Sequence, residues 1–265
     1  MPTTGTHRAL ILAAGLGTRL RPLTADVPKT LIKVHGVAIL ENALRQLASC
    51  GVRETAIVVG YRSDAVEGVY GDHFRGMRLS YVRSDVFERT GSAYSMWLAR
   101  DFLAAGSCLL LEGDVFFERA VLTRLLRSEH PDAGAVAPMS PLLTGSAATL
   151  DERGRARELR LNQKMSDALV EPLYKTINIY RFTAETLQSQ LLPELDRTIV
   201  GGAHGAYVEQ ILSALIRPQG LQLGAVDCGD LNWFEIDSVE DLRIAERIFA
   251  PEQPAPEGQL AERFA

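Results

Sequence analysis

The sequence has few cysteines and no long apolar run, and each shortage excludes a class of protein. Its cysteines, Cys50, Cys108 and Cys228, show no C-x-x-C spacing, so we expect a reducing compartment rather than a disulfide framework. No stretch approaches the roughly 20 apolar residues that a membrane span needs. Residues 1–7 are polar and do not resemble a signal peptide. These features predict a cytoplasmic protein with no membrane partner.

The chain also lacks a surplus of positive charge. Lys plus Arg number 28 against 33 Asp plus Glu, and the formal net charge of -5 is atypical of a nucleic-acid-binding protein. The five histidines show no metal-ligand spacing, and aromatic residues make up only 7% of the chain. A length of 265 residues allows one domain with a large core. We assign this domain to residues 1–250 and interpret the proline-containing residues 251–265 as a C-terminal tail.

Apolar runs alternate with segments of helical spacing along most of the chain. Predicted strands cover Ala9–Ala14, Thr55–Tyr61, Cys108–Leu111, Gly134–Pro138, Thr176–Phe182 and Leu221–Val226. Predicted helices cover Ile39–Ser49, Ala93–Leu103, Ala120–Ser128, Glu185–Leu195 and Tyr207–Ile216. This alternation predicts an α/β fold: a three-layer, Rossmann-like, mostly parallel mixed sheet with helices on both faces. Ligands of such sheets bind beyond the carboxyl ends of the strands.

The pattern changes in the middle of the chain. Ala148–Leu161 is typical of two short strands around a turn at residues 151–154, and we expect a small β-hairpin flap beside the main sheet. Asn162–Pro172 has weak periodicity and is predicted to be a loop, where substrate contacts are common.

A loop of small residues follows the first predicted strand. Its backbone N–H groups can form a nest for phosphate oxygens because four residues lack bulky side chains: Ala13, Ala14, Gly15 and Gly17. Arg19 and Lys29 add positive charge nearby. The P-loop motif G-x-x-x-x-G-K-[ST] is absent, and Leu20 stands where a dinucleotide-binding fingerprint needs a small residue. By itself, the pattern also fits a glycine-rich turn with two solvated cations.

Two pairs of carboxylates lie far apart in the sequence. Glu112 and Asp114 end a predicted buried strand, and Glu235 and Asp237 precede a segment of helical character. Hard oxygen ligands of this kind suit Mg²⁺. The aspartates also have a simpler interpretation, because either Asp237 or Ser238 fits a helix cap and Asp114 could cap a turn. Each glutamate alternates with its aspartate, so the two should share a side of the strand.

The string L-A-A-G-x-G-T-R-L-x-P-x-T, followed by P-K, resembles the signature of nucleotidylyltransferases with the nucleotide-diphospho-sugar transferase fold. Later segments follow in that family's order to about Phe249, so the resemblance covers nearly the whole chain. It implies that the glycine loop, including Thr18, holds the triphosphate of an incoming nucleotide. Arg19 and Lys29 would neutralise this triphosphate and the pyrophosphate that leaves.

The same resemblance implies that Asp114 and Asp237 hold a catalytic Mg²⁺, with Glu112 beside the nucleotide. The phosphate or phosphonate oxygen of the acceptor would attack the α-phosphorus in line and expel pyrophosphate. Neither a protein nucleophile nor a general base is required, because that oxygen is already anionic. The protein would lower the barrier by positioning two anions and neutralising their charge.

The start of the predicted helix near residue 93 is our candidate for the base-binding segment. Backbone N–H groups and small side chains of the segment Thr90–Ser95 could read a base edge, and we assign Gly91, Ser92 and Ala93 to nucleotide binding. Ser92 also fits an ordinary N-cap. This stretch is more compact than in sugar nucleotidylyltransferases. The segments Y-K-T-I-N-I-Y and W-F-E-I-D resemble a cytidylyltransferase branch that acts on phosphocholine, 2-aminoethylphosphonate and related compounds. The expected nucleotide is therefore CTP.

Sugar nucleotidylyltransferases usually bind the acceptor phosphate with a lysine in an E-K-P context, which is absent here. Lys175, at the start of a predicted strand, is our candidate for this catalytic contact. Lys164 is a rival, and Lys175 could instead be a surface lysine on an edge strand.

The far end of the acceptor could be recognised in two ways. A choline-like cation would need aromatic rings around it, for which Tyr180, Tyr207 and Trp233 are candidates. A primary amine would need a carboxylate, for which Glu209 is a candidate, and Glu235 is also assigned to the acceptor side.

Three other functions remain open at this stage. A hexose-1-phosphate nucleotidylyltransferase using dTTP, UTP or GTP would share the phosphate-binding residues. A non-catalytic nucleotide-binding module would be expected to lose an aspartate or the signature lysine. A glycosyltransferase would usually carry D-x-D, which Glu112-Gly113-Asp114 only approximates. In each case the expected partners are small molecules, and the chain could also form a homodimer.

Overall fold

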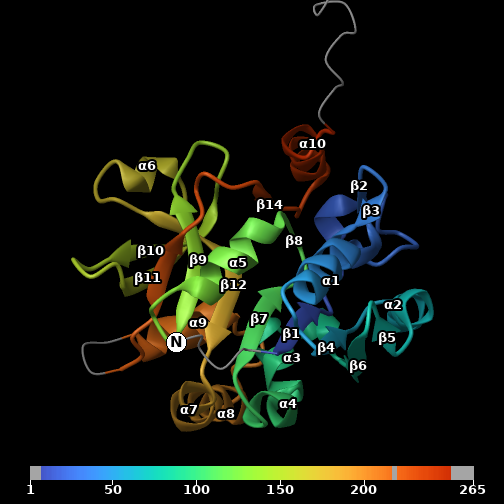
Figure 1. The fold of residues 1–265 in the computed structure, drawn as a ribbon, viewed down its shortest axis with the longest axis horizontal. Helices are drawn as coiled ribbons and strands as arrows, with labels where there is room; N and C mark the ends of the chain where they lie inside the picture. Colours follow the sequence, from blue (N-terminus) through green and yellow to red (C-terminus); the bar gives the residue numbers. More distant parts are fainter. Residues whose placement is uncertain (1–6, 217–219, 252–265) are drawn as a thin grey trace, which may run out of the picture.

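The computed structural model describes residues 7–216 and 220–251, so the predicted tail beyond Pro251 lies outside the described residues. Ten of the described strands form one sheet in the order β11-β10-β12-β7-β1-β4-β6-β5, with β9 paired to both β12 and β13 (Figure 1). These strands are β1 (Arg8–Ala13), β4 (Glu54–Val59), β5 (His73–Phe74), β6 (Met77–Arg83), β7 (Cys108–Glu112), β9 (Ala133–Pro138), β10 (Gly145–Leu150), β11 (Ala156–Gln163), β12 (Tyr174–Phe182) and β13 (Gly224–Asp227).

Two small sheets and a set of helices complete the described fold. The small sheets pair β2 (Lys33–Val34) with β3 (Val37–Ala38), and β8 (Val115–Phe117) with β14 (Trp233–Glu235). The α-helices are α1 (Ile39–Ser49), α2 (Ser63–Tyr70), α3 (Ser92–Leu98), α4 (Arg100–Ala104), α5 (Arg119–Arg127), α6 (Met165–Ala168), α7 (Ala184–Thr186), α8 (Leu192–Val200), α9 (Val208–Leu215) and α10 (Val239–Ile248).

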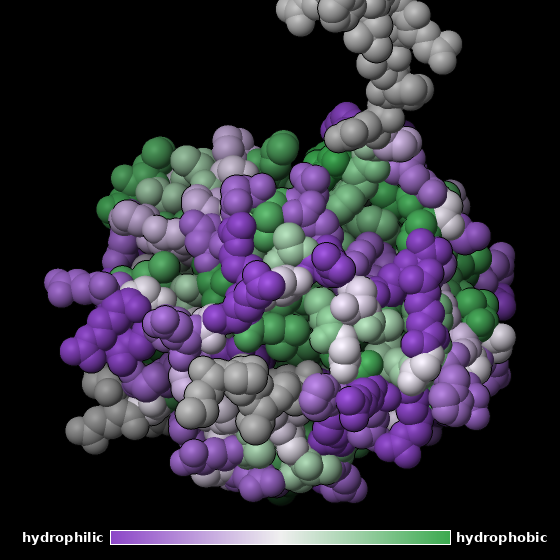
Figure 2. All heavy atoms as spheres, viewed as in Figure 1, coloured by the Kyte–Doolittle hydropathy of each residue, from purple (hydrophilic) through white to green (hydrophobic). Residues whose placement is uncertain are grey.

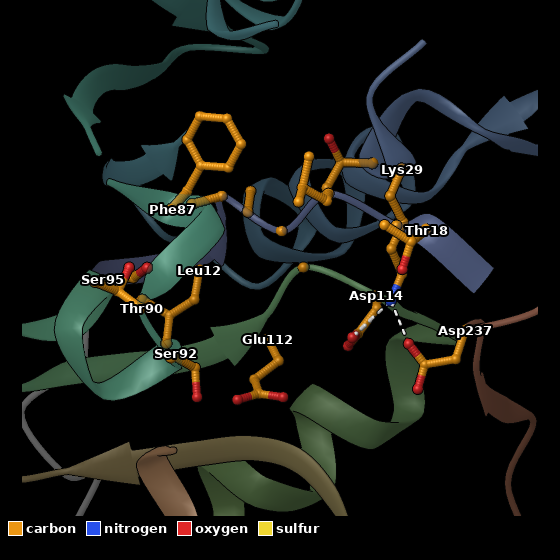
Figure 3. A pocket seen from close by; sticks show the side chains of 18 of the residues that line it. Leu12, Thr18, Lys29, Phe87, Thr90, Ser92, Ser95, Glu112, Asp114 and Asp237 are labelled. Carbon is orange, nitrogen blue, oxygen red and sulfur yellow. Dashed lines mark hydrogen bonds and ion pairs between the residues drawn. The ribbon is translucent and has the colours of Figure 1, made fainter. Parts of the chain in front are cut away.

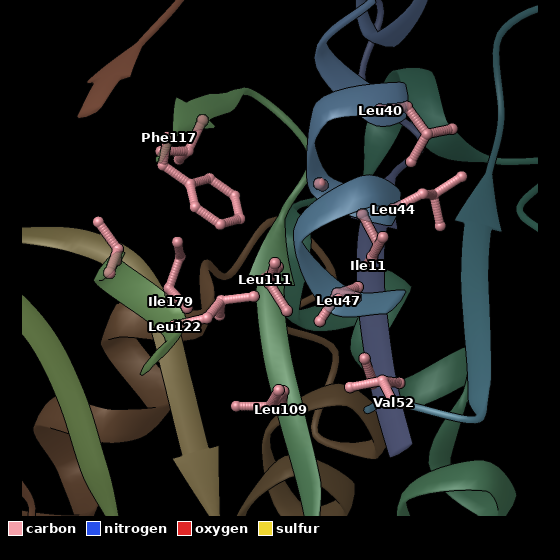
Figure 4. Close-up of a cluster of buried hydrophobic side chains, with 14 of the residues drawn as sticks. Ile11, Leu40, Leu44, Leu47, Val52, Leu109, Leu111, Phe117, Leu122 and Ile179 are labelled. Atoms are coloured by element: carbon pink, nitrogen blue, oxygen red, sulfur yellow. The ribbon is translucent and has the colours of Figure 1, made fainter. Parts of the chain in front are cut away.

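Alternate residues of the central strands pack on opposite faces of the sheet. Ile11 of β1 and Leu111 of β7 belong to a hydrophobic cluster with α1 and α5, part of which Figure 4 shows. Leu10 and Leu110 instead join a second cluster with α3, α8 and α9. This alternation follows from the two-residue repeat of a strand and buries both faces. The predicted three-layer α/β arrangement is therefore confirmed.

Parallel pairing places the functional loops at one edge of the sheet. β1 lies between β4 and β7 and is parallel to both, with Leu12 level with Glu112. The carboxyl ends of β1 and β7 therefore lie together, as expected for ligand binding in an open α/β sheet. The mixed character comes from β12, which runs antiparallel to β7 and carries β9 and β10.

Several predicted boundaries need correction. The hairpin at Ala148–Leu161 exists, but it is no separate flap, because β10 pairs with β12 and extends the main sheet. The predicted loop at Asn162–Pro172 is wrong in part, since β11 continues to Gln163 and the short helix α6 follows. The predicted helix at Ala93–Leu103 is two helices, α3 and α4, that meet at Ala99.

Some elements escaped prediction because their apolar patterns are short. The segment from α2 to β6 and the small strands β2, β3, β8 and β14 belong to this group. The predicted strand at Leu221–Val226 begins later, at Gly224. Its first residues still contribute Leu221 and Leu223 to the core, so their apolar character reflects packing rather than strand pairing.

The surface is mixed in character. On the face drawn in Figure 2, hydrophilic and hydrophobic residues are interspersed. None of the helices in the described part of the chain combines the length and apolar composition that crossing a bilayer requires.

Candidate active site

The glycine loop leaves β1 at the carboxyl edge of the sheet and lines a cavity of about 360 Å³ (Figure 3). Gly17 has φ 62° and ψ 35°, the left-handed region that favours glycine. A Cβ atom added to Gly17 would lie 2.8 Å from Cβ of Lys29, so a glycine lets that side chain pack on the loop. The loop residues predicted to bind the nucleotide all line this cavity: Ala13, Ala14, Gly15, Gly17 and Thr18.

The two glycines of the loop are expected to differ in what they support. Gly17→Ala should lower the free energy of unfolding by about 1–2 kcal/mol, because alanine resists the left-handed conformation and presses on Lys29. Gly15→Ala is the matched control: no protein atom lies within 4 Å of its added Cβ, so only nucleotide binding should suffer. Thermal melting compares the two variants, and equal melting temperatures would contradict this assignment.

Pairing between β8 and β14 brings the distant carboxylates together. Asp114 lies between β7 and β8, Asp237 follows β14, and the Ile236 N–H donates to the Asp114 carbonyl oxygen at 2.9 Å. Carboxylate oxygens of Asp114, Glu235 and Asp237 lie within 4.8 Å of one another. Glu235, which was predicted to contact the acceptor, thus lies beside both predicted metal ligands.

Asp237 does not cap helix α10. Ser238 Oγ accepts a hydrogen bond from the Asp241 N–H at 3.2 Å, and Asp241 Oδ2 accepts one from the Ser238 N–H at 2.7 Å. This reciprocal capping box satisfies the start of the helix. The Asp237 carboxylate is left to face the cavity, where it meets two cations.

Those cations are Lys29 and Arg19. Lys29 Nζ donates to Asp114 Oδ2 at 2.9 Å and to Asp237 Oδ1 at 2.6 Å, as the dashed lines in Figure 3 show. Arg19 reaches the other oxygen of Asp237 at 2.8 Å. Burial opposes the charged form of Lys29, but the two carboxylates outweigh it and raise the pKa of the ammonium group. Burial likewise opposes ionisation of Asp237, yet Lys29 and Arg19 lower its pKa.

The carboxylate cluster fits a hard divalent cation. Asp114 Oδ1 is buried and has no hydrogen-bond partner among the described residues. A lone pair left open beside two further carboxylates suits Mg²⁺, which takes one or two carboxylates together with phosphate oxygens and water. Asp114 and Asp237 are the residues that would hold it, with Glu235 next to them.

Part of the predicted base-binding segment forms hydrogen bonds with a neighbouring segment of the chain. The N–H groups of Gly91 and Ala93 donate to the carbonyl oxygens of His204 at 2.9 Å and Ala206 at 3.1 Å. A Cβ on Gly91 would lie 2.1 Å from the Ala206 oxygen, so this glycine permits a close backbone approach. The prediction that these two N–H groups read a base is therefore wrong. They hold the chain segment before α9 instead.

Ser92 has a structural role that differs from the predicted N-cap. Gly91 occupies the cap position, and Ser92 Oγ accepts a hydrogen bond from the Val208 N–H at 3.1 Å. Gly91 and Ser92 still line the first cavity, whereas Ala93 is fully buried. Thr90 and Ser95, the two ends of the predicted segment, also line this wall, whereas sequence reasoning missed Phe87. Phe87 precedes the helix in a segment without periodicity, so only its aromatic character could have drawn attention.

A second cavity of about 820 Å³ adjoins the first, and Lys175 lies in its wall. This side chain is only 2% exposed, so the alternative of a surface lysine is wrong. Its Nζ donates to the Thr176 carbonyl oxygen at 2.6 Å and pairs with Glu235 Oε2 at 2.9 Å. A Cβ on Gly145 would lie 3.2 Å from Lys175 Cε, so a glycine makes room for the lysine. The rival, Lys164, lines the same cavity.

Three glutamates line this second cavity: Glu112, Glu209 and Glu235. Burial raises the pKa of all three carboxyl groups, and repulsion from Glu209 raises that of Glu112 further. Lys175 opposes this increase at Glu209 and Glu235. The described residues thus place more acidic than basic groups around the cavity.

Asn178 was missed by sequence reasoning. Its Nδ2 lies 3.4 Å from Glu112 Oε2 and 3.5 Å from Glu235 Oε1. Its φ of 60° is left-handed, and the pairing of β12 with β9 shifts register between Thr176 and Tyr180. This irregularity turns an asparagine, one of the residues that tolerate such a φ best, towards the acids. The signal that could have identified this residue is an asparagine inside an otherwise apolar strand.

The predicted aromatic cage is not assembled. Trp233 packs in the hydrophobic core, 7% exposed, and Tyr180 is 2% exposed and lies in the second core cluster. Neither lines the second cavity, because their strands turn these rings towards the packed layers. Tyr207 does line it and is 56% exposed, and Phe234 is the other aromatic residue among the described lining residues.

Comparison with known proteins gives a family for this arrangement. Residues 8–140 match the model of the nucleotidyl transferase family. CMP-5'-(3-aminopropyl)phosphonate synthase of Streptomyces rubellomurinus is 37% identical over 92% of this chain, although the chain spans only 39% of that relative's length. CTP:phosphoglutamine cytidylyltransferase of Campylobacter jejuni is 25% identical over 89% of this chain and 98% of its own length.

The fold has solved counterparts. An inositol-1-phosphate CTP transferase from T. maritima superposes with a TM-score of 0.72 at 24% identity, covering 92% of this chain and 95% of that one. It shows the same arrangement of sheet and helices. The family match covers the glycine loop, Lys29 and Asp114, the residues whose geometry is described above. The chain therefore belongs to the nucleotidyl transferase family.

Proposed function

We propose that this protein transfers CMP from CTP to the phosphonate or phosphate of a small amine-bearing acceptor and releases pyrophosphate. The observation that carries this proposal is the meeting of the two cavities. The residues that line both are Arg19, Glu112, Asp114, Tyr207 and Asp237. A nucleotide in the first cavity and an acceptor in the second would meet beside the two aspartates.

The side chains of the site divide the proposed work between them. The glycine loop binds the triphosphate through backbone N–H groups, while Lys29 and Arg19 balance the charge of the departing pyrophosphate. The acceptor is held so that its anionic oxygen lies in line with the α-phosphorus and the leaving oxygen. When bound by Asp114 and Asp237, Mg²⁺ supplies positive charge where the two anions meet.

The names of the relatives support the choice of CTP. Two of the proteins similar to this chain are described as a synthase of a CMP-phosphonate and a CTP-dependent cytidylyltransferase. The rival, a hexose-1-phosphate nucleotidylyltransferase, is supported by a UTP–glucose-1-phosphate uridylyltransferase of Haloferax volcanii that is 36% identical over 41% of this chain.

The second cavity favours an acceptor with a primary amine. Glu209 is 7% exposed. Around its carboxylate, the described acidic groups outnumber the cations, so negative charge is in excess there. An ammonium group could donate hydrogen bonds to this carboxylate and offset its burial. A quaternary ammonium would need several rings, and the described residues offer only Tyr207 and Phe234.

A pyrophosphate-release assay with Mg²⁺ tests the proposal. Four nucleoside triphosphates are each combined with 2-aminoethylphosphonate, phosphocholine and glucose 1-phosphate. We expect turnover with CTP and 2-aminoethylphosphonate, and slower turnover with phosphocholine. Turnover with glucose 1-phosphate and UTP or dTTP alone would contradict the proposal and favour the hexose-1-phosphate rival.

The assignment of Glu209 gives a separate prediction. Glu209→Gln should raise the KM for 2-aminoethylphosphonate about 10- to 100-fold, because an ion pair between ammonium and carboxylate becomes a hydrogen bond from the ammonium group to a neutral amide. The kcat should change little, and the variant should fold normally because the amide keeps the size of the side chain. Ethylphosphonate, which lacks the amine, is the control acceptor. An equal rise in KM for ethylphosphonate would assign Glu209 a structural role instead.

A further inference from the structure

Lys29 forms ion pairs with the carboxylates that would bind a metal. Its Nζ is 2.9 Å from Asp114 Oδ2 and 2.6 Å from Asp237 Oδ1, and Arg19 is 2.8 Å from the second oxygen of Asp237. Three of the four oxygens of the two aspartates are therefore paired with protein cations, and only Asp114 Oδ1 lacks a partner. The residues expected to neutralise a triphosphate are, in this state, neutralising the metal ligands.

We propose that Lys29 is a placeholder in the metal site, and that a nucleoside triphosphate completes this site by drawing Lys29 away from Asp114 and Asp237. The inference rests on the proposed use of a nucleoside triphosphate and extends it to the order in which the site is assembled. In this state Lys29 is a positioning residue, and it becomes a phosphate ligand when the nucleotide enters.

Electrostatic repulsion prevents the Lys29 ammonium group and a metal ion from occupying the space between Asp114 and Asp237 at the same time. An ammonium group within 2.9 Å of both carboxylates occupies the space between them and repels a second cation there. The side chain of Lys29 is 10% exposed, so water screens this repulsion only weakly. A metal ion alone would have to displace the ammonium group, and the described residues that line this cavity then offer it one further carboxylate, Glu112, against the several charges of a triphosphate.

The triphosphate provides such an anion. The loop that would hold it packs against the base of Lys29, since the added Cβ at Gly17 would lie 2.8 Å from Lys29 Cβ and 3.4 Å from Cγ. The first carbons of the side chain are thus fixed, while the ammonium group at the end of the chain can turn from the aspartates to the loop. Nucleotide and metal should therefore bind with positive coupling, each favouring the other.

Binding of each ligand by itself provides the test, without any turnover. Mn²⁺ is titrated into the nucleotide-free protein, and the free ion is followed by electron paramagnetic resonance. We expect Lys29→Met to bind Mn²⁺ about 10-fold or more tightly than the wild type, because the competing charge is gone. Arg19→Gln should give a smaller gain of about 2- to 3-fold, since Arg19 is 70% exposed and screened by water. Lys33→Met, which changes an exposed lysine on β2, is the charge control.

Nucleotide binding is then measured with CTP in EDTA by calorimetry. Lys29→Met should bind metal-free CTP about 10-fold more weakly, an effect opposite in sign to that on Mn²⁺. Unchanged Mn²⁺ affinity in Lys29→Met and Arg19→Gln would contradict the placeholder role, as would unchanged CTP affinity in Lys29→Met. Arg19→Gln changes an exposed side chain and keeps the Mn²⁺ test valid if Lys29→Met fails to fold. A wild type that binds UTP or GTP rather than CTP would overturn the proposed function and leave this inference standing.

Discussion

Asp114→Ala is expected to reduce kcat in the pyrophosphate-release assay by about 10³-fold, because it removes a proposed metal ligand at the place where the two cavities meet. The melting temperature should stay within about 2 °C of the wild type. The backbone of Asp114 keeps the hydrogen bond from Ile236, and Lys29 keeps Asp237 as a partner. Removing one of three clustered carboxylates also relieves their mutual repulsion.

Asp230→Asn is the matched control for this variant. Asp230 is an exposed acid that pairs with Arg124 on α5, and it lines neither of the two cavities. It should leave kcat unchanged, so that a general effect of losing a carboxylate is separated from an effect at the site. An Asp114→Ala protein that folds and keeps kcat within about 3-fold of the wild type would remove Asp114 from the proposed machinery.

The parts of the site that are local in the sequence could be predicted, because one short stretch of sequence shows both the residue types and their spacing. The glycine loop and Lys29 lie close together in the sequence, and they line one cavity. Asp114 could be placed because it lies just beyond Glu112, the last residue of a buried strand at the carboxyl edge of the sheet. Asp237 was a candidate on the same grounds of residue type, and only the family resemblance joined the two aspartates as ligands of one metal. The pairing of β8 with β14 explains the contact.

The parts that depend on tertiary packing escaped prediction. The sequence does not tell that the N–H groups of Gly91 and Ala93 are taken by His204 and Ala206, because the segments are more than a hundred residues apart. Nor does it tell which aromatic residues face a cavity. Trp233 lies on a strand whose two faces meet different surroundings, and the register of β14 on β8 turns its ring into the core.

Lys175→Met is expected to affect both stability and activity, and the two effects need separate measurements. Lys175 is 2% exposed and pairs with Glu235 at 2.9 Å. Its loss leaves Glu209 and Glu235 without the cation that opposes the rise of their pKa. Breaking a buried pair from one side costs about 3–5 kcal/mol, so we expect the melting temperature to fall by about 10 °C.

A second substitution separates a counter-ion from an acceptor-binding group. In Glu235→Gln the buried charge that Lys175 balances is gone, so adding Lys175→Met should cost much less stability than it does in the wild type. Glu235→Gln alone is the reference for activity, because Glu235 also lies beside the two aspartates. If Lys175 binds the phosphonate, the double variant should still show a KM for 2-aminoethylphosphonate about 10-fold or more above that reference. An unchanged KM would mean that Lys175 serves only to neutralise Glu235, and the acceptor's anionic end would then have to be assigned to Lys164, the other lysine among the described residues that line this cavity.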